Sequence, residues 1–260
     1  MGTTEDNRRA WEIANRKYVL ESDTFVKVAD DGTLLPLEVD TIAPLLRPGS
    51  VVLHLQSGNG TEDPALSRLA GSTVVGVDFS AEAATSAQHR VRILESSVSY
   101  VVADALRVPL AQECVDLVYT GKGALMWLPD LPTWASEVVR VLRPGGWFFL
   151  YEAHPSASLW THDTDDVRVR SDLSYFGGTR PNDSFPASAI KRFDPDSRSQ
   201  AIEWQWTMAD VVMALLDAGL QLVQLGEHPE PFWRPADAGT VAAWAGTVPN
   251  SFSLLATKAG

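Results

Sequence analysis

The segment VVLHLQSGNG, residues 51–60, decides the fold of this chain. A mostly apolar run, Val51 to Leu55, precedes a turn that carries glycine at positions 58 and 60. Glycine adopts backbone conformations that other residues avoid, and such a turn lets backbone N–H groups approach a ligand at the start of a helix. The segment therefore predicts a strand, a turn and a following helix, and the turn is either a ligand-binding turn or a plain structural connection.

Apolar runs and helical segments alternate along the chain after residue 50, a pattern typical of parallel βαβ units. The predicted strands span residues 51–55, 74–77, 98–102, 115–119, 146–151, 221–225 and 251–258. The predicted helices span residues 11–20, 37–46, 63–70, 81–91, 131–142 and 208–218. Because no long crossover joins the last two strands, we expect the last one to be antiparallel. The fold class is α/β, with a seven-stranded, mostly parallel, doubly wound sheet.

Two segments flank the predicted sheet. Residues 11–20 mix Trp11 and Tyr18 with charges at helical spacing and predict a helix that closes over the site, whereas residues 21–36 predict a loop. The stretch from residue 153 to about 205 is aromatic-rich with little periodicity, and such a long segment is usually functional or disordered. We divide the single domain, 1–260, into a helical lid (1–46), a cofactor-binding core (47–152), a substrate-side insertion (153–206) and the C-terminal part of the sheet (207–260).

Composition narrows the class of partner. Of 260 residues, 21 are Lys or Arg and 33 are Asp or Glu, a net charge of −12, which argues against binding to nucleic-acid phosphates or anionic lipids. The one cysteine, Cys114, forms no intrachain disulfide and fits a reducing cytoplasm. Residues 1–10 are too polar for a signal peptide, and no apolar run approaches the roughly 20 residues of a membrane span. We expect a cytoplasmic protein with a small-molecule partner and no nucleic-acid or membrane partner; the sequence does not indicate an oligomeric state.

Carboxylates follow the second and third predicted strands. In an open parallel sheet, ligands bind beyond the carboxyl ends of the strands. The second strand ends in Asp78 and Phe79, a pair suited to the two ribose hydroxyls and to one face of a base. The third ends in Asp104 and Ala105, a carboxylate suited to the adenine amino group. The sequence therefore predicts an adenosine site, although Asp78 has the alternative role of capping the next helix.

The motifs of residues 45–155, taken in order, resemble those of class I S-adenosylmethionine-dependent methyltransferases. The matching segments are residues 51–60, 77–80, 103–105, 115–119 and 142–146. Residues 54–56, 119–130 and 152–155 are similar to a largely uncharacterised bacterial small-molecule subgroup. The resemblance implies that the chain binds S-adenosylmethionine, releases S-adenosylhomocysteine and needs no metal. The cofactor contacts expected with it are Tyr18, Gln56, Gly58, Gly60, Asp78, Phe79, Asp104, Ala105 and Thr120.

Two residues depart from the commonest family pattern, which has an acidic residue where His54 stands and a glycine where Gln56 stands. The methionine ammonium then needs another partner. The side-chain carbonyl of Gln56 and the backbone carbonyls of Thr120 and Gly121 are candidates. We interpret His54, in an apolar strand, as a buried, hydrogen-bonded histidine rather than a catalyst.

The expected reaction is an in-line displacement, which needs a base only when the nucleophile must lose a proton. His154, after the fifth strand, is the favoured base, and its alternative role is to shape the exit of the chain from the sheet. Lys122 is either a contact for a substrate anion or a solvated surface residue. The expected substrate contacts are Trp127, Glu152, Trp160, Tyr175, Phe176 and His228, and Trp204, Trp206 and Trp233 are further aromatic candidates.

The sequence thus predicts a methyltransferase that acts on O, N or C of a small apolar or aromatic metabolite. Arginine outnumbers lysine by 16 to 5, which hints at a GC-rich bacterial genome and specialised metabolism. Three alternatives stay open. The fold is either repurposed for a non-methylating reaction such as cyclisation or rearrangement, or used by a NAD-dependent oxidoreductase, or kept as a non-catalytic binding protein.

Overall fold

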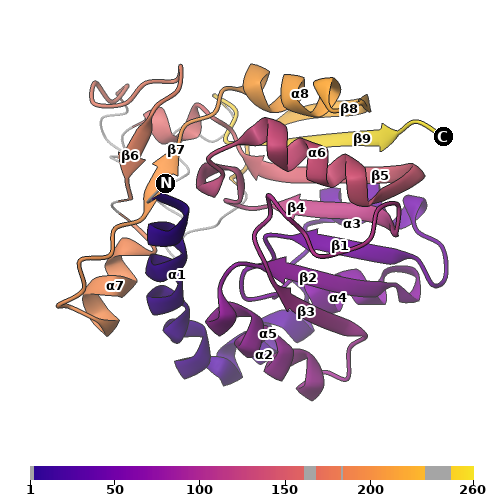
Figure 1. Cartoon of the computed structure of the whole chain (residues 1–260), viewed down its shortest axis with the longest axis horizontal. Helices are drawn as coiled ribbons and strands as arrows, with labels where there is room; N and C mark the ends of the chain where they lie inside the picture. Colours follow the sequence, from indigo (N-terminus) through magenta and orange to yellow (C-terminus); the bar gives the residue numbers. More distant parts are fainter. Residues whose placement is uncertain (1–2, 161–167, 183, 232–246) are drawn as a thin grey trace.

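The computed structural model describes residues 3–160, 168–182, 184–231 and 247–260. Seven strands form one sheet in the order β3-β2-β1-β4-β5-β9-β8 (Figure 1). The strands are β1 (Val51–Leu55), β2 (Thr73–Asp78), β3 (Val98–Val102), β4 (Val115–Gly121), β5 (Leu142–Ala153), β8 (Leu220–His228) and β9 (Ser251–Lys258). β1 to β5 are parallel, and β9 runs antiparallel to both β5 and β8. The predicted sheet with an antiparallel last strand is confirmed.

Helices cover both faces of the sheet, because side chains alternate between the faces along each strand. The main helices are α1 (Thr3–Leu20), α2 (Ser22–Asp31), α3 (Pro36–Ile42), α4 (Asp63–Arg68), α5 (Ala81–Ile93), α6 (Leu131–Val141), α7 (Ala187–Phe193) and α8 (Met208–Asp217). Leu53 and Val118 pack in one core with α6 and α8. Val52 and Leu117 pack in the other, with residues of α3, α4 and α5. Figure 1 shows α6 in front of the sheet and α3 and α4 behind it.

The predicted loop over residues 21–36 is wrong, because residues 22–31 form α2. No side chain caps the start of this helix, so the local sequence carries no clear start signal. Its stability comes from tertiary contacts instead. Ala29 is buried, and the ring of Phe25 lies 4.7 Å from that of Tyr18 in an edge-to-face contact.

The segment after β5 contains more structure than its irregular pattern indicates. β6 (Thr179–Pro181) and β7 (Ile202–Trp204) form an antiparallel pair, with α7 between them in the chain. Trp204 lies in β7, and Trp206 lies just beyond it. Figure 1 places α7, the β6–β7 pair and α1 beyond the carboxyl ends of the parallel strands. The fold thus brings the N-terminal helix and the segment after β5, which were both expected beside the site, to the same edge of the sheet.

Asn7 joins α1 to β7. Its Nδ2 donates to the Ile202 carbonyl at 2.8 Å, and its Oδ1 accepts from the Ile202 N–H at 2.7 Å. Two hydrogen bonds to one backbone unit fix the helix along the strand. Among the helices of the described ranges, none has the length and apolar character needed to cross a membrane.

Candidate functional site

A cavity of about 220 Å³ lies at the carboxyl ends of β1 to β4, and α1 lines one side of it. The turns after four strands meet here because parallel strands end at the same edge of a sheet. Of the predicted cofactor residues, Tyr18, Gln56, Gly58, Asp78, Phe79, Asp104 and Ala105 line this cavity, as does Trp127, predicted as a substrate contact. Gly60 and Thr120 lie next to lining residues but are not in the wall themselves.

Asp78 ties two backbone segments of the cavity together. Its Oδ2 accepts from the Gly58 N–H and its Oδ1 from the Ser80 N–H, both at 2.9 Å. Burial raises the pKa of Asp78 to about 6, although these two hydrogen bonds oppose the rise. The carboxylate is therefore fixed in place and still has lone pairs for a ligand.

The turn after β1 contains three residues with positive φ, namely Gln56, Gly58 and Gly60. At Gly60 a Cβ atom would collide with the Tyr100 hydroxyl, so this position requires glycine for space as well as for backbone conformation. Gly60 packs against Tyr100, and Gly58 lines the cavity. Gly60 is thus required by the packing of the turn, whereas Gly58 is placed to contact a ligand.

Gln56 offers one free amide oxygen to the cavity wall. Its Nε2 donates to the Ala124 carbonyl at 2.9 Å, which leaves Oε1 buried and without a hydrogen-bond partner among the described residues. The hydroxyl of Ser57, also in the wall, is buried and unpartnered in the same sense. Unsatisfied buried polar atoms are rare and need an explanation. Contact with a polar ligand in the cavity would explain both unpartnered atoms.

His54 is buried and hydrogen-bonded, as predicted, and one part of it reaches the cavity wall. Its Nδ1 lies 2.5 Å from Asp63 Oδ1, and the Tyr100 hydroxyl donates to Asp63 Oδ2 at 2.7 Å. Burial lowers the pKa of His54, but the adjacent Asp63 carboxylate outweighs burial and raises it. The departure from the acidic family residue at position 54 is therefore accompanied by a carboxylate nine residues later in the chain.

Lys122 is paired rather than free. Its Nζ lies 3.0 Å from Glu38 Oε2 and 3.4 Å from Glu62 Oε1, and it donates to the Thr33 carbonyl at 3.1 Å. Burial lowers its pKa, but the two carboxylates outweigh that effect and raise it. The side chain is 16% exposed. These contacts favour a positioning role for Lys122 over either a substrate contact or a solvated side chain.

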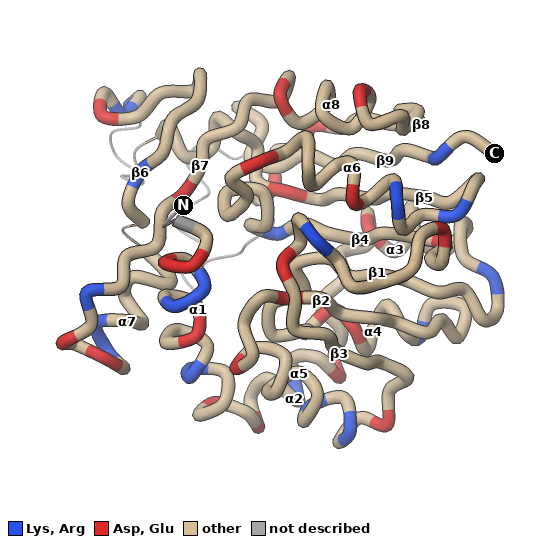
Figure 2. Tube along the Cα trace, viewed as in Figure 1, with Lys and Arg blue, Asp and Glu red and all other residues tan. Residues whose placement is uncertain are grey.

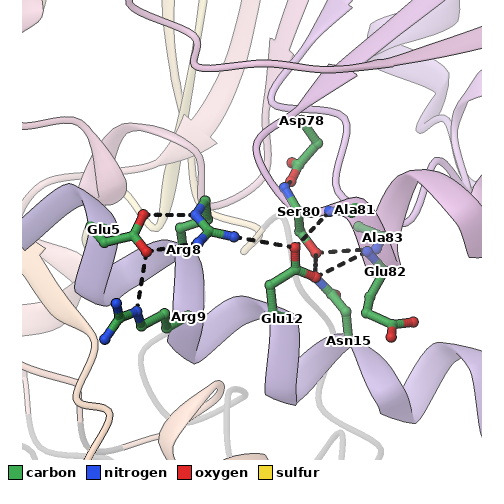
Figure 3. Close-up of polar contacts among 10 residues, drawn as sticks. All are labelled: Glu5, Arg8, Arg9, Glu12, Asn15, Asp78, Ser80, Ala81, Glu82 and Ala83. Atoms are coloured by element: carbon green, nitrogen blue, oxygen red, sulfur yellow. Dashed lines mark hydrogen bonds and ion pairs between the residues drawn. The ribbon is translucent and has the colours of Figure 1, made fainter.

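The helix α1 is held to the first turn of α5 by one of its own carboxylates, that of Glu12. Glu12 accepts from the N–H groups of Ala81 and Glu82 at 2.8 and 3.0 Å and from the Ser80 hydroxyl at 3.0 Å (Figure 3). A negative charge at a helix N-terminus is stabilising because the N–H groups there lack partners within the helix. Asn15 adds a hydrogen bond from Nδ2 to Ser80 Oγ at 2.9 Å.

Figure 2 shows acidic and basic residues alternating along α1. Glu5 accepts from both Arg8 and Arg9, and Arg8 in turn lies 3.7 Å from Glu12 (Figure 3). These exposed ion pairs contribute little to stability on their own.

A second, smaller cavity of about 70 Å³ contains His154 and Glu152. Glu152 accepts from the N–H groups of Gly123, Ala124, Leu125 and Ala153 at 2.6 to 3.1 Å. A carboxylate has about four lone-pair sites, so these bonds occupy it fully. Burial raises its pKa and the four bonds oppose the rise. Glu152 thus fixes the loop that carries the Ala124 carbonyl.

His154 is held at both ring nitrogens. Nδ1 lies 2.7 Å from Ser156 Oγ and Nε2 lies 2.9 Å from Glu227 Oε1. Burial lowers the pKa of His154 while Glu227 opposes that change, so the ring is held toward its neutral, basic form. The 3₁₀ turn η3 (Leu125–Trp127) contributes Leu125 to this cavity and Trp127 to the first one. It therefore forms part of the wall between them.

The remaining predicted substrate residues lie away from both cavities. The Tyr175 hydroxyl accepts from the Met208 N–H at 3.2 Å, and Phe176 is 87% exposed. His228 Nε2 lies 2.8 Å from Ser253 Oγ. Trp160 is half-buried beside Val169. The second cavity instead contains Trp204 and Trp206, and Trp233 lies outside the described residues.

The sequence reasoning did not identify Asn15 and Glu62, which both line the first cavity. A signal for Asn15 was present, because positions 11, 15 and 18 share one face of a helix and Trp11 and Tyr18 were expected to face the site. Trp11 meets Trp127 edge to face at 5.3 Å, which closes this side of the cavity. No local signal marks Glu62, which depends on the pairing with Lys122.

Comparison with known proteins supports the same assignment. Residues 53–150 match the family described as a methyltransferase domain. The chain is 36% identical over 100 residues to methyltransferase GfsG of Streptomyces halstedii, covering 38% of this chain and 36% of that protein. It is 24% identical over 177 residues to methyltransferase phqN of Penicillium fellutanum, covering 64% and 54% respectively. The chain thus spans about a third to a half of the length of the curated relatives it matches.

Solved structures share the fold. An S-adenosylmethionine-dependent methyltransferase from Mesorhizobium loti superposes with a TM-score of 0.60 at 19% identity, covering 88% of this chain and 100% of that chain. Geranyl diphosphate C-methyltransferase from Streptomyces coelicolor A3(2), solved with Mg²⁺, geranyl diphosphate and S-adenosylhomocysteine, gives 0.57 at 17% identity, covering 85% and 79%. Residues 53–150 thus match a methyltransferase domain, and the chain shares the fold of solved S-adenosylmethionine-dependent methyltransferases, in agreement with the predicted family.

The residues of the first cavity fit this cofactor. A fixed carboxylate, Asp78, follows β2, and the unpartnered polar atoms of Gln56 and Ser57 follow β1. Across the described part of the chain, no group of three or more His, Cys, Asp or Glu side chains is arranged to hold a metal.

The pKa of Asp78 predicts a pH dependence of cofactor affinity. If the ionised carboxylate holds the ribose, affinity for S-adenosylhomocysteine is full above about pH 7 and falls as Asp78 takes up a proton near pH 6. At pH 5 about one molecule in ten is ionised, so we expect the Kd to rise about tenfold. Calorimetric titrations between pH 5 and 8 measure this change.

The control is Asp78→Asn, whose residual affinity should vary little over this range. His54 and Glu12 are the charged groups that act on Asp78, and both are unchanged in the variant. An equal pH dependence in the two proteins would contradict the assignment.

Proposed function

We propose that the chain is an S-adenosylmethionine-dependent methyltransferase that acts on O, N or C of a small, apolar or aromatic metabolite. The observation that carries the proposal is the first cavity, where Asp78 joins the glycine turn to α5 in a domain of the methyltransferase family. The net charge of −12 supports a small molecule over a nucleic acid as acceptor. The free Cys114 fits the predicted cytoplasmic location.

The proposed cofactor contacts divide between the two ends of the cavity. Asp78 holds the ribose hydroxyls, and Phe79 and Ala105 flank the base, beside Asp104. At the other end Gln56 Oε1 accepts from the methionine ammonium. S-adenosylmethionine would supply an electrophilic methyl group at this site.

The task of the protein is then to position the acceptor and to exclude water. Proximity and orientation contribute about 7–11 kcal/mol at the favourable extreme. Trp11 and Trp127, in contact at 5.3 Å, present apolar surface at the lid side of the cavity. This surface supports an apolar or aromatic acceptor. GfsG and phqN are named as methyltransferases, and the Streptomyces coelicolor enzyme is solved with geranyl diphosphate, an apolar chain with a charged end.

His154 is our proposed base for acceptors that must lose a proton. Its lowered pKa keeps the ring neutral at pH 7. Because Nε2 donates to the Glu227 carboxylate, the lone pair of the neutral ring is on Nδ1, which accepts from Ser156. This role therefore requires Ser156 to move aside and, since η3 separates the two cavities, the acceptor to reach past Leu125. The competing role is structural, with Ser156 and Glu227 holding the chain exit.

A second candidate function keeps the fold and changes the chemistry to a reaction without methyl transfer. His54 and Gln56 favour it, since both depart from the commonest family pattern. The two candidates differ in one product, because only methyl transfer releases S-adenosylhomocysteine in step with acceptor consumption.

Turnover with a panel of neutral phenols, amines and methylene carbon acids tests the main proposal. We expect S-adenosylhomocysteine to form in a one-to-one ratio with methylated product for at least one class. Asp78→Ala should reduce cofactor affinity tenfold or more, since each lost charge-assisted hydrogen bond contributes about 1.5–3 kcal/mol. Acceptor consumption without S-adenosylhomocysteine would favour the second candidate instead.

Gln56→Gly separates stability from binding. The variant removes a side chain from a residue with φ of 59°, which relieves about 1–2 kcal/mol, and it loses the bond to Ala124, which costs about 1 kcal/mol. We therefore expect nearly unchanged thermal stability. The Kd for S-adenosylhomocysteine should rise about tenfold, whereas that for 5′-methylthioadenosine, which lacks the amino acid, should not change. Equal losses for the two ligands would show that Gln56 does not bind the ammonium.

His154→Ala should lower turnover at least tenfold with an acceptor that must be deprotonated, with cofactor affinity near the parent value. The exposed His89 on α5 provides a matched control, and His89→Ala should leave both quantities unchanged. Parent-level turnover in His154→Ala would make His154 a structural residue.

A further inference from the structure

Asn15 of α1 carries a buried polar atom to which no role has yet been assigned. The residue is 2% exposed and lines the first cavity. Its Oδ1 has no hydrogen-bond partner among the residues that the structure describes. Buried amide oxygens are almost always paired, so this one marks a position where a donor is missing.

Ser80 determines which way the Asn15 amide faces (Figure 3). A serine hydroxyl has one proton to donate and two lone pairs that accept. The proton goes to Glu12 Oε2 at 3.0 Å, because a carboxylate only accepts. The lone pairs accept from the Ala83 N–H at 3.1 Å and from Asn15 Nδ2 at 2.9 Å.

Turning the amide over would place Asn15 Oδ1 against a hydroxyl oxygen whose proton is already committed to Glu12. Nδ2 therefore faces Ser80, and Oδ1 is the polar atom that Asn15 offers to a ligand. Glu12 acts here as a positioning residue, since it fixes the Ser80 proton.

Asn15 lies next to the carboxylate that holds the ribose in the proposed function. The Ser80 N–H donates to Asp78 Oδ1 at 2.9 Å, while the Ser80 hydroxyl accepts from Asn15. Asp78 and Asn15 are thus bonded to the same residue and both line the cavity. An amide oxygen here needs an O–H or N–H donor, and ribose hydroxyls are the donors expected beside Asp78.

We propose that Asn15 Oδ1 accepts a hydrogen bond from a ribose hydroxyl of the adenosyl ligand, so that α1 reads the sugar together with Asp78. This inference rests on the proposed function, because it takes the ligand to be an adenosyl compound. It makes α1 a ligand-binding element in addition to a cover. It also makes the docking of α1 and the binding of the ligand mutually stabilising, because both engage the Asn15 side chain.

The test compares ligands that differ only in the ribose. Adenosine, 2′-deoxyadenosine and 3′-deoxyadenosine are titrated in competition with S-adenosylhomocysteine against the full chain and Asn15→Leu, which is similar in size but has no polar atom. We expect the Kd of adenosine to rise three- to tenfold in the variant. At least one deoxy ligand should lose less than twofold, because it already lacks the partner hydroxyl.

Asn7→Leu is the matched control, since Asn7 is a buried asparagine on the same helix with both side-chain polar atoms paired to Ile202. Any loss that it causes should be equal for the three ligands. An equal loss for the three ligands in Asn15→Leu as well, or no loss for adenosine, would overturn the inference. Failure of the parent chain to bind S-adenosylhomocysteine would instead count against the proposed function.

Hydrogen exchange on the parent protein provides a second test that does not depend on a variant. When each ligand is saturating, adenosine should slow amide exchange in residues 11–20 at least threefold more than the deoxyadenosine that lacks the hydroxyl contacted by Asn15. Equal protection of α1 by all three ligands would contradict a contact between Asn15 and the ribose.

Discussion

The paired hydrogen bonds of Asp78 are the constraint on which the rest of the site depends. One carboxylate oxygen holds the Gly58 N–H of the turn after β1, and the other holds the Ser80 N–H at the start of α5. Two strands that are neighbours in the sheet are thereby locked to each other at their carboxyl ends. The arrangement buries the Asp78 carboxylate, and this burial raises its pKa to about 6. A ligand that donates hydrogen bonds to this carboxylate would stabilise its charged form.

Ser80 extends this constraint to the N-terminal helix. Its hydroxyl joins Glu12 and Asn15 of α1 to the first turn of α5, next to the backbone N–H that Asp78 holds. The N-terminal helix is therefore not an independent layer over the cavity. It is hydrogen-bonded to residues 80–82, directly after Asp78, so changes in α1 reach the cavity through Ser80.

The end of β1 shows how the fold accommodates a buried residue that differs from the family pattern. His54 stands where an acidic residue is common, and its Nδ1 lies 2.5 Å from Asp63 Oδ1. A buried imidazole without such a partner would be neutral, because burial disfavours its charged form. Asp63 supplies that partner, so the pKa of His54 is raised although the ring is buried. Gln56, with its free oxygen, is the polar group left at the wall.

The sequence alone predicted the seven strands to within a few residues, and seven of the nine expected cofactor contacts line the first cavity. Strand periodicity and Gly or Pro boundaries are local signals, and parallel strands bring their carboxyl ends together without further information. α2 was missed because its contacts come from distant parts of the chain: the Arg90 guanidinium lies over the Phe25 ring, and Arg68 donates to the Ala29 carbonyl.

The positions of His154 and Asn15 could not be predicted for a similar reason. β5 lies two places from β1 in the sheet and η3 comes between, so the end of β5 opens into the second cavity. Asn15 was on the correct helix face, but its orientation depends on Ser80 and Glu12, 65 and 3 residues away.

Calorimetric titration of the full chain with S-adenosylmethionine and S-adenosylhomocysteine, with NAD as the control, tests the central claim most directly. The account predicts one-to-one binding of both sulfur ligands with micromolar Kd values and no measurable binding of NAD. Absence of binding by both sulfur ligands to the folded protein, or equally tight binding of NAD, would contradict the claim that Asp78, Gln56 and α1 form an S-adenosylmethionine site.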